Sequence, residues 1–250
     1  MISTVILYKN EKESLKRCLD SLMWCDDVVI VHDAHDTQAD PPATRPGVSV
    51  IRRILQSDFS AQRNFGMQYT KNEWVLFLDA DEELSSELIE TLCNFSPDTE
   101  ISAYAIPRID IFWNQRIVHG EVGSAASEGI LRLVHKNKGT WEGAVHETYR
   151  TKGLTERLDH SIFHYPHQTI AEFLHDVNFY SSIRAREVEG RPKWQLCGEM
   201  ILYPPLKFKY TYLIKLGILD GAAGFVYSFM MSFHSFLVRA KAITKTYDTL

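Results

Sequence analysis

Residues 74–83 read WVLFLDADEE, a short apolar run that ends in a cluster of four carboxylates. A run of this length and composition is typical of a buried strand, and open α/β sheets bind their ligands at the carboxyl ends of such strands. Holding Asp79 and Asp81 close together is electrostatically costly unless a cation compensates. Mg²⁺ and Mn²⁺ prefer oxygen ligands and often bridge to phosphates. The stretch therefore predicts a metal-nucleotide site.

The same acids have a second interpretation. They could form a solvated turn before a helix, because Ser85, Ser86 and Glu87 offer N-cap hydroxyls and a favourable early charge. An isolated D-x-D would favour this reading, since short motifs match by chance. The buried strand that precedes the pair favours the site.

Strand and helix patterns alternate outward from this stretch. Strands are expected at 3–8, 27–31 and 48–51, with a helix after the first strand that begins with a capping box of Asn10 and Glu13. A second helix is expected at 60–69, before the strand that ends at Asp79. This order predicts an α/β fold with a mostly parallel sheet flanked by helices, whose strand ends share one crevice.

Composition limits the class without naming the activity. The chain has 250 residues, 45% of them hydrophobic, and a net charge of -5, which gives no support for a nucleic-acid partner. Its four cysteines show no metal or disulfide spacing, so reduced thiols in the cytoplasm are expected. The N-terminus lacks a basic stretch and a cleavage site, and no signal peptide is expected.

The pattern changes near residue 103 and again near 168. We expect a catalytic domain at 1–167, with a nucleotide-binding half at 1–100 and an acceptor half at 101–167. A helical extension is expected at 168–250, opened by a capping box of Thr169 and Glu172.

Residues 216–238 are apolar except for one formal charge, Asp220. Their length approaches that of a membrane span, but three glycines and Asp220 disfavour spanning. Basic residues flank both ends: Lys207, Lys209, Lys215, Arg239, Lys241 and Lys245. We therefore expect peripheral contact with an anionic membrane surface, with a buried core helix as the alternative.

Seven segments together resemble the inverting family 2 glycosyltransferases of the GT-A fold, a Rossmann-like fold for nucleotide-diphosphate sugars. The likeness is greatest to the bacterial lipopolysaccharide core enzymes that add a hexose. The segments are Ile6–Glu11, Ala61–Gly66, Trp74–Glu83, Ala105–Arg108, Leu131–Leu133, Val145–Glu147 and Phe163–Tyr165. Such ordered coverage is more specific than any single motif.

The resemblance implies a nucleotide-diphosphate sugar donor and a divalent metal, Mn²⁺ or Mg²⁺, that offsets charge on the leaving diphosphate. It makes Asp81 the first metal ligand and directs Asp79 towards the ribose or the bound metal's surroundings. His164 would complete metal or diphosphate binding, or else be a structural histidine.

Inversion requires a base that takes the proton of the acceptor hydroxyl. The resemblance places Glu128 at this position, with Glu147 as second choice, although either could be a salt-bridged acid and Arg132 is a candidate partner for Glu128. The residues expected to bind substrate are Tyr8, Asn10, Glu11, Asp33, Gln62, Arg63, Asn64, Asp79, Arg132 and His146.

The expected function is transfer of a hexose, glucose in particular, to a lipopolysaccharide-core or other lipid-linked glycan at the inner face of the bacterial cytoplasmic membrane. Two alternatives stay open. The Asp33 loop lacks the family's glycines, which suits a sugar-binding relative with impaired catalysis. A haloacid-dehalogenase-type phosphatase also carries D-x-D after a strand, but on its first strand.

Overall fold

The computed structural model describes residues 1–33, 45–56, 58–143 and 147–245. They form two compact units, one of residues 1–108 with 128–164 and one of residues 109–127 with 165–250. The chain passes from the first unit to the second for the last time after residue 164, three residues before the boundary expected at 167. Residues 109–127, expected in the acceptor half, group instead with the C-terminal helices.

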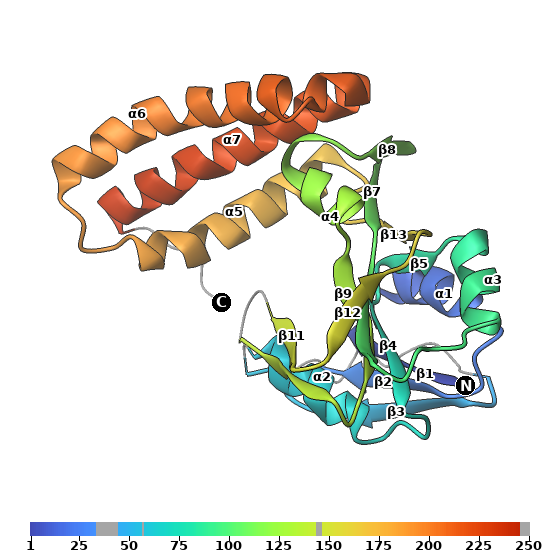
Figure 1. Ribbon diagram of the computed structural model, residues 1–250. Helices are drawn as coiled ribbons and strands as arrows, with labels where there is room; N and C mark the ends of the chain where they lie inside the picture. The colour runs from blue at the N-terminus through green and yellow to red at the C-terminus, as the bar shows by residue number, and fades with distance from the viewer. Residues whose placement is uncertain (34–44, 57, 144–146, 246–250) are drawn as a thin grey trace. The chain divides into compact units, whose positions relative to one another are not determined.

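The first unit is built on a seven-stranded sheet (Figure 1). Its spatial order is β12 (Leu154–Arg157), β6 (Ile101–Ile106), β9 (Ile130–His135), β4 (Trp74–Asp79), β1 (Ile2–Tyr8), β2 (Val28–His32) and β3 (Val48–Arg52). Only β9 runs against the others, because its pairings with β4 and β6 are both antiparallel. The expected α/β class, with a mostly parallel sheet flanked by helices and a helical C-terminal part, is confirmed.

Alternate residues of each central strand enter separate cores, as expected for a sheet covered on both faces. Ile6, Ile30 and Leu78 face helices α1 (Lys12–Asp20) and α3 (Ser86–Cys93). On the other face, the hairpin of β10 (Gly139–Glu142) and β11 (Thr148–Thr151) and helix α2 (Phe59–Met67) cover residues such as Val5 and Phe77.

Helix α2 lies close to the sheet at Gly66. A Cβ atom there would be 2.6 Å from Val5 Cγ1 and 2.7 Å from Val31 Cγ2. The helix begins with Asp58 as its N-cap, whose side chain accepts a hydrogen bond from the Ala61 amide at 2.9 Å. These contacts fix the helix that carries Arg63.

Two of the expected helix starts are confirmed and one is wrong. Thr169 and Ser85 each accept a hydrogen bond from the amide three residues on. The capping box of Asn10 and Glu13 does not form: α1 has Glu11 as its N-cap and no side-chain cap bond. Glu11 instead accepts from the amides of Lys9 and Asn10, which satisfies the turn before the helix.

Short β5 (Glu82–Leu84) follows β4 directly and pairs antiparallel with β13 (Ile162–His164). This pairing brings the acidic stretch beside the last strand of the first unit.

The second unit contains β7 (Arg108–Phe112, of which Arg108 belongs to the first unit), β8 (Gln115–Ile117), η1 (Gly120–Val122) and α4 (Gly123–Ser127). Its C-terminal part is α5 (Ile170–Glu187), α6 (Lys193–Lys209), the π-helical turn η2 (Tyr210–Ile214), η3 (Gly217–Asp220) and α7 (Gly221–Thr244). Helix α7 packs against both α5 and α6 (Figure 1). Residues of α5 and α7, among them Phe173 and Tyr227, form its main core.

Among the described residues, one helical stretch, Gly217–Thr244, is long and apolar enough to cross a membrane by length and composition. This stretch contains an apolar window of 18 residues, and 44% of that window is buried inside the protein. The expected apolar segment 216–238 is thus partly a core helix of this unit.

Candidate active site

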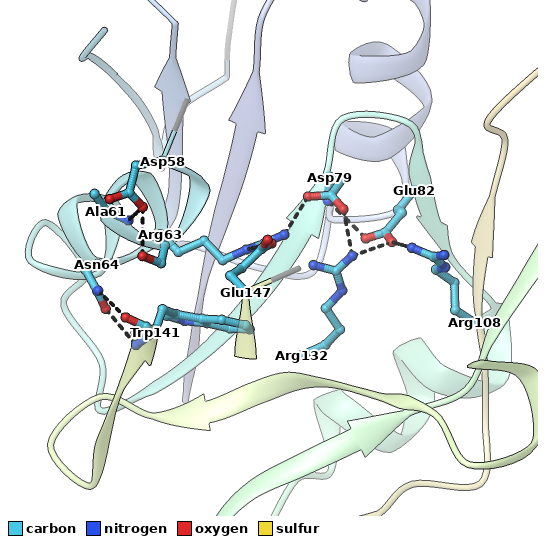
Figure 2. A network of polar contacts seen from close by, with 11 residues as sticks. Asp58, Ala61, Arg63, Asn64, Asp79, Glu82, Arg108, Arg132, Trp141 and Glu147 are labelled. Carbon is cyan, nitrogen blue, oxygen red and sulfur yellow. Dashed lines mark hydrogen bonds and ion pairs between the residues drawn. The ribbon is translucent and has the colours of Figure 1, made fainter. Parts of the chain in front are cut away.

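Asp79 ends β4 and is held by two arginines from other elements (Figure 2). Its Oδ1 accepts from Arg63 Nη2 at 2.9 Å, and its Oδ2 accepts from Arg132 Nη2 at 2.6 Å. Arg63 comes from α2 and Arg132 from β9. Both arginine side chains are buried, whereas Asp79 is 32% exposed. The structure thus brings together three residues that the sequence predicted as substrate ligands.

A second carboxylate, Glu82, completes this cluster from the buried side. Glu82 is fully buried and accepts from Arg132 Nη2 at 2.7 Å and from the Asp79 amide at 3.0 Å. Arg108 Nη1 lies 3.7 Å from the same carboxylate. Sequence reasoning did not assign Glu82 or Arg108 to the site. Both stand inside motifs that carried the resemblance, so position in those motifs was the available signal.

The two neighbouring carboxylates have opposite electrostatic environments. Burial by itself raises the pKa of Asp79, but the Arg132 and Arg63 charges outweigh it and hold this pKa far below its ordinary value. Burial raises the pKa of Glu82, and the charge of Asp79 adds to that effect against the opposing pull of Arg132. Asp79 is therefore ionised at any physiological pH.

Arg63 links this cluster to a third carboxylate. Its Nε donates to Glu147 Oε1 at 2.8 Å, and its guanidinium carbon lies 5.0 Å from the Trp141 ring centroid (Figure 2). A planar guanidinium suits both contacts. Glu147 is thus engaged with an arginine that also holds Asp79.

Asp81 has a different partner. Its Oδ2 lies 3.4 Å from His164 Nε2, so that the two residues predicted to bind metal face each other across the β5–β13 pairing. Both side chains are partly exposed. Three or more His, Cys, Asp or Glu side chains are nowhere clustered to hold a metal within the described ranges. A cation at Asp81 would therefore need further oxygen ligands from a substrate or from water.

Glu128 lies at the same edge of the sheet. Because β9 runs antiparallel to β4, its amino end at Ile130 is at the edge where Asp79 ends. Gly129 has a φ of 81°, and a Cβ there would lie 2.8 Å from the Ile106 carbonyl carbon, so only glycine fits this turn. Glu128 itself is exposed, and Arg132 pairs with Asp79 and Glu82 rather than with it.

Two predicted ligands on α2 are used for packing. The Asn64 side chain donates to the Trp141 carbonyl at 2.8 Å and accepts from the Trp141 amide at 3.0 Å, which holds β10 to the helix (Figure 2). The Gln62 side chain donates to the Arg53 carbonyl and accepts from its guanidinium. Neither amide joins the Asp79 cluster.

The remaining predicted ligands lie at the ends of β1 and β2. Tyr8 is buried with its ring 5.3 Å from that of His32. Asp33 is buried and accepts from the Leu55 amide at 3.2 Å. Asn10 and Glu11 are exposed. These positions share the carboxyl edge of the parallel strands with Asp79, whereas His146 is outside the described residues.

Comparison with known proteins finds relatives that are named as glycosyltransferases. An uncharacterized glycosyltransferase of Rickettsia typhi is 27% identical over 96% of this chain and 86% of its own length. The lipopolysaccharide core biosynthesis glycosyltransferase LpsC of Rhizobium meliloti is 25% identical over 96% of this chain and 91% of its own. The solved structure of S. aureus TarS residues 1–349 aligns with 99% of this chain and with 93% of its own length, at 10% sequence identity. Its TM-score of 0.45 is too low to identify a shared fold.

The glycosyl transferase family 2 profile matches residues 3–162, which include the strand that ends at Asp79, both of its arginine partners and Asp81. With most of its length matched, and with relatives named as glycosyltransferases aligned almost from end to end, this chain belongs to glycosyl transferase family 2.

Proposed function

We propose that this family 2 enzyme moves a hexose, with inversion, from a nucleotide-diphosphate sugar to a glycolipid or lipopolysaccharide-core acceptor. The observation that carries the proposal is that the two aspartates of the acidic stretch, Asp79 and Asp81, have different ion-pair partners. Asp79 is neutralised by Arg63 and Arg132, whereas Asp81 faces His164 at the site's partly exposed side. The family assignment leaves the phosphatase alternative without support.

Charge counting supports a cation at Asp81. Three carboxylates (Asp79, Glu82 and Glu147) lie among three arginines (Arg63, Arg108 and Arg132), so this cluster balances formally. Asp81 stands outside that balance, and its ion-pair partner among the described residues is His164. One carboxylate and one imidazole fit Mn²⁺ or Mg²⁺ when donor phosphates and water supply the other ligands.

Bound there, the metal ion would offset negative charge on the departing diphosphate. The protein's own arginines act differently. Arg63 and Arg132 are buried and are also bound by other carboxylates, so their positions are fixed. They therefore hold Asp79 in place at the strand end. Asp79 in turn can accept hydrogen bonds from a ribose hydroxyl.

Glu128 is the proposed base. Its exposed carboxylate takes the proton of the acceptor hydroxyl while that oxygen bonds to the anomeric carbon. The bond from the anomeric carbon to the diphosphate oxygen breaks on the opposite face, and the diphosphate leaves with the electron pair. Glu147 is the weaker candidate because Arg63 already holds its carboxylate.

The acceptor proposal rests on the lipopolysaccharide core role in the name of LpsC. Glucose is the hexose that we propose. Such acceptors are membrane-bound, which suits a position at the cytoplasmic face of the bacterial membrane.

Release of nucleoside diphosphate from a panel of nucleotide sugars, with Mn²⁺, Mg²⁺ or chelator, tests the reaction. We expect release from at least one hexose donor, its loss with chelator, and opposite anomeric configurations in donor and product. Release that is undiminished by chelator would contradict the metal proposal, and retained configuration would contradict Glu128 as the base of a single displacement. Stabilisation by a nucleotide without turnover on any acceptor would instead indicate the sugar-binding alternative.

A further inference from the structure

Helix α6 and the turns that follow it expose a continuous series of large apolar side chains. We call residues 201–219 the apolar face. Ile201 is 68% exposed, Ile214 70% and Leu219 64%, and the other large exposed members are Leu202, Tyr203, Leu206, Tyr210, Leu213, Leu216 and Ile218. Monomeric soluble proteins rarely leave so many large apolar residues together in water.

These side chains are not the core of the second unit. Leu196 is the single buried residue of α6, whereas α7 buries nine residues, among them Ala223, Tyr227 and Met230. Helix α7 packs against α5 and α6 and thus supplies the core (Figure 1). The exposed apolar residues of α6, such as Ile201 and Leu206, therefore point away from the core of their own unit.

The charge on this face has one sign. Residues 200–219 contain Lys207, Lys209 and Lys215 and no Asp or Glu. The acids at both ends are largely buried and bound by basic side chains or amides. Glu199 is 12% exposed and bound by Arg239 at 3.2 Å. Asp220 is 3% exposed, and it accepts from the His119 amide at 2.9 Å and contacts the His119 ring at 2.7 Å.

A cavity of about 730 Å³ opens within the same region. Leu202, Tyr203, Leu206 and Tyr210 line it together with Lys207 and Lys215, and Glu121, Glu199 and Thr211 complete its wall. Lys215 Nζ lies 5.5 Å from the Tyr210 ring centroid, and Lys207 Nζ lies 3.1 Å from Glu121. Both carboxylates of the wall are bound by basic side chains, Glu121 by Lys207 and Glu199 by Arg239. The apolar wall beside the Lys215 ammonium group suits an acyl chain below an anionic headgroup.

We infer that the apolar face binds an anionic lipid bilayer and lies in its headgroup region. Lysines mixed with large aliphatic and tyrosine side chains are typical of interfacial helices, whereas lysine is depleted at protein interfaces. The inference rests on the proposed function for its biological purpose. It places the membrane contact on α6 and the turns after it, rather than on the whole apolar segment 216–238.

Sedimentation of the full chain with vesicles tests this directly and needs no donor or acceptor. Phosphatidylcholine vesicles with and without phosphatidylglycerol are compared. The wild type should bind the anionic vesicles, and it should bind the neutral ones at least tenfold more weakly.

Two double variants separate the apolar and ionic contributions. Ile201→Glu with Ile214→Glu should abolish binding, and Lys209→Gln with Lys215→Gln should weaken it about 25-fold, since each lysine near an anionic surface contributes about fivefold. Met23→Glu, at a 64% exposed residue of the first unit, and Lys152→Gln, at an exposed residue there, are the matched controls and should bind as the wild type does.

Equal binding to both vesicle types, or wild-type binding by the double variants, would overturn the inference. So would a wild-type dimer that ignores vesicles and becomes monomeric when Ile201 and Ile214 are replaced, because the face would then join two copies. Release of nucleoside diphosphate from the nucleotide sugar is measured separately, in the wild type and in both double variants. If the glycosyl transfer proposal is wrong, the wild type will release none and will still bind the anionic vesicles.

Discussion

Arg132 Nη2 lies 2.6 Å from Asp79 Oδ2, which ties the end of β4 to the antiparallel strand β9. The same nitrogen donates to Glu82 at 2.7 Å. One buried guanidinium thus serves two carboxylates of the acidic stretch. The two aspartates of the D-x-D sequence consequently have separate environments, with arginines at Asp79 and a histidine at Asp81.

Replacing Arg132 by Met should destabilise the protein strongly. The substitution leaves the fully buried Glu82 with the Asp79 amide and, as its arginine partner, the longer 3.7 Å contact to Arg108. Loss of one partner of a buried pair costs about 3–5 kcal/mol. Urea denaturation measures the free energy of unfolding. Arg150→Met, at a side chain 70% exposed in a 4.0 Å pair with Glu142, is the control and should change it by less than about 1 kcal/mol. A similar loss in both variants would contradict a specific role for the buried cluster.

Asp81→Asn should abolish the response to metal while leaving the fold intact. We expect the wild type to be stabilised against heat by Mn²⁺ with nucleoside diphosphate, and the variant to lose both this shift and turnover. Glu83→Gln is the matched control, because Glu83 lies one strand position from Glu82 and lines a different surface groove with Lys16 and Arg17. An undiminished thermal shift in the Asp81 variant would refute the metal assignment.

Glu128→Gln and Glu147→Gln should affect different kinetic constants. Removal of the base should lower kcat by about 10²–10⁴-fold with little change in the donor KM. Removal of the Glu147 charge should release Arg63 and raise the donor KM, because Asp79 loses its fixed neighbour. Steady-state kinetics at saturating acceptor distinguish these cases, and a reversed pattern would make Glu147 the base.

Gly66→Ala should destabilise the first unit by about 1–3 kcal/mol, since the added methyl group would overlap Val5 and Val31 at 2.6 and 2.7 Å. Gly198→Ala, also within a helix but with nothing within 4 Å of the added Cβ, should be neutral or stabilising by up to about 1 kcal/mol. Chemical denaturation of both variants checks the contrast. Equal changes in the free energy of unfolding would show that helix propensity, rather than packing against Val5 and Val31, determines the effect of the added methyl group.

His234 on α7 should make stability depend on pH. Burial, aided by the Lys207 charge, lowers the pKa of His234 to about 4, whereas an unfolded histidine titrates near about 6.5. Between these values the unfolded chain binds more protons, so the stabilising contribution is complete above about pH 6.5 and declines as the pH falls towards 4.

At pH 5 this histidine should cost about 1–2 kcal/mol relative to pH 7. His234→Gln should remove that part of the decline when urea midpoints are compared at the two pH values. An identical decline in wild type and variant would assign the pH dependence to other groups.

The sequence alone determined four of the seven strands of the central sheet, the acidic end of β4 and the family. Apolar runs such as 74–78 are local patterns, and they appear as almost continuously buried strands at Trp74–Asp79 and Ile2–Tyr8, as expected. The ordered motifs identified the glycosyltransferase. Local patterns also revealed the caps at Ser85 and Thr169, because each depends on residues only three positions apart.

Only the tertiary structure decided which charges meet. Arg63 and Glu147 are 84 positions apart, and the Asp81–His164 contact depends on the pairing of β5 with β13. The structure also showed that Asn64 holds β10 and that Ile201, Leu202 and Leu206 of α6 point outward. Ion pairs and exposed faces depend on strand register and helix packing, which join distant residues through contacts that no local periodicity records.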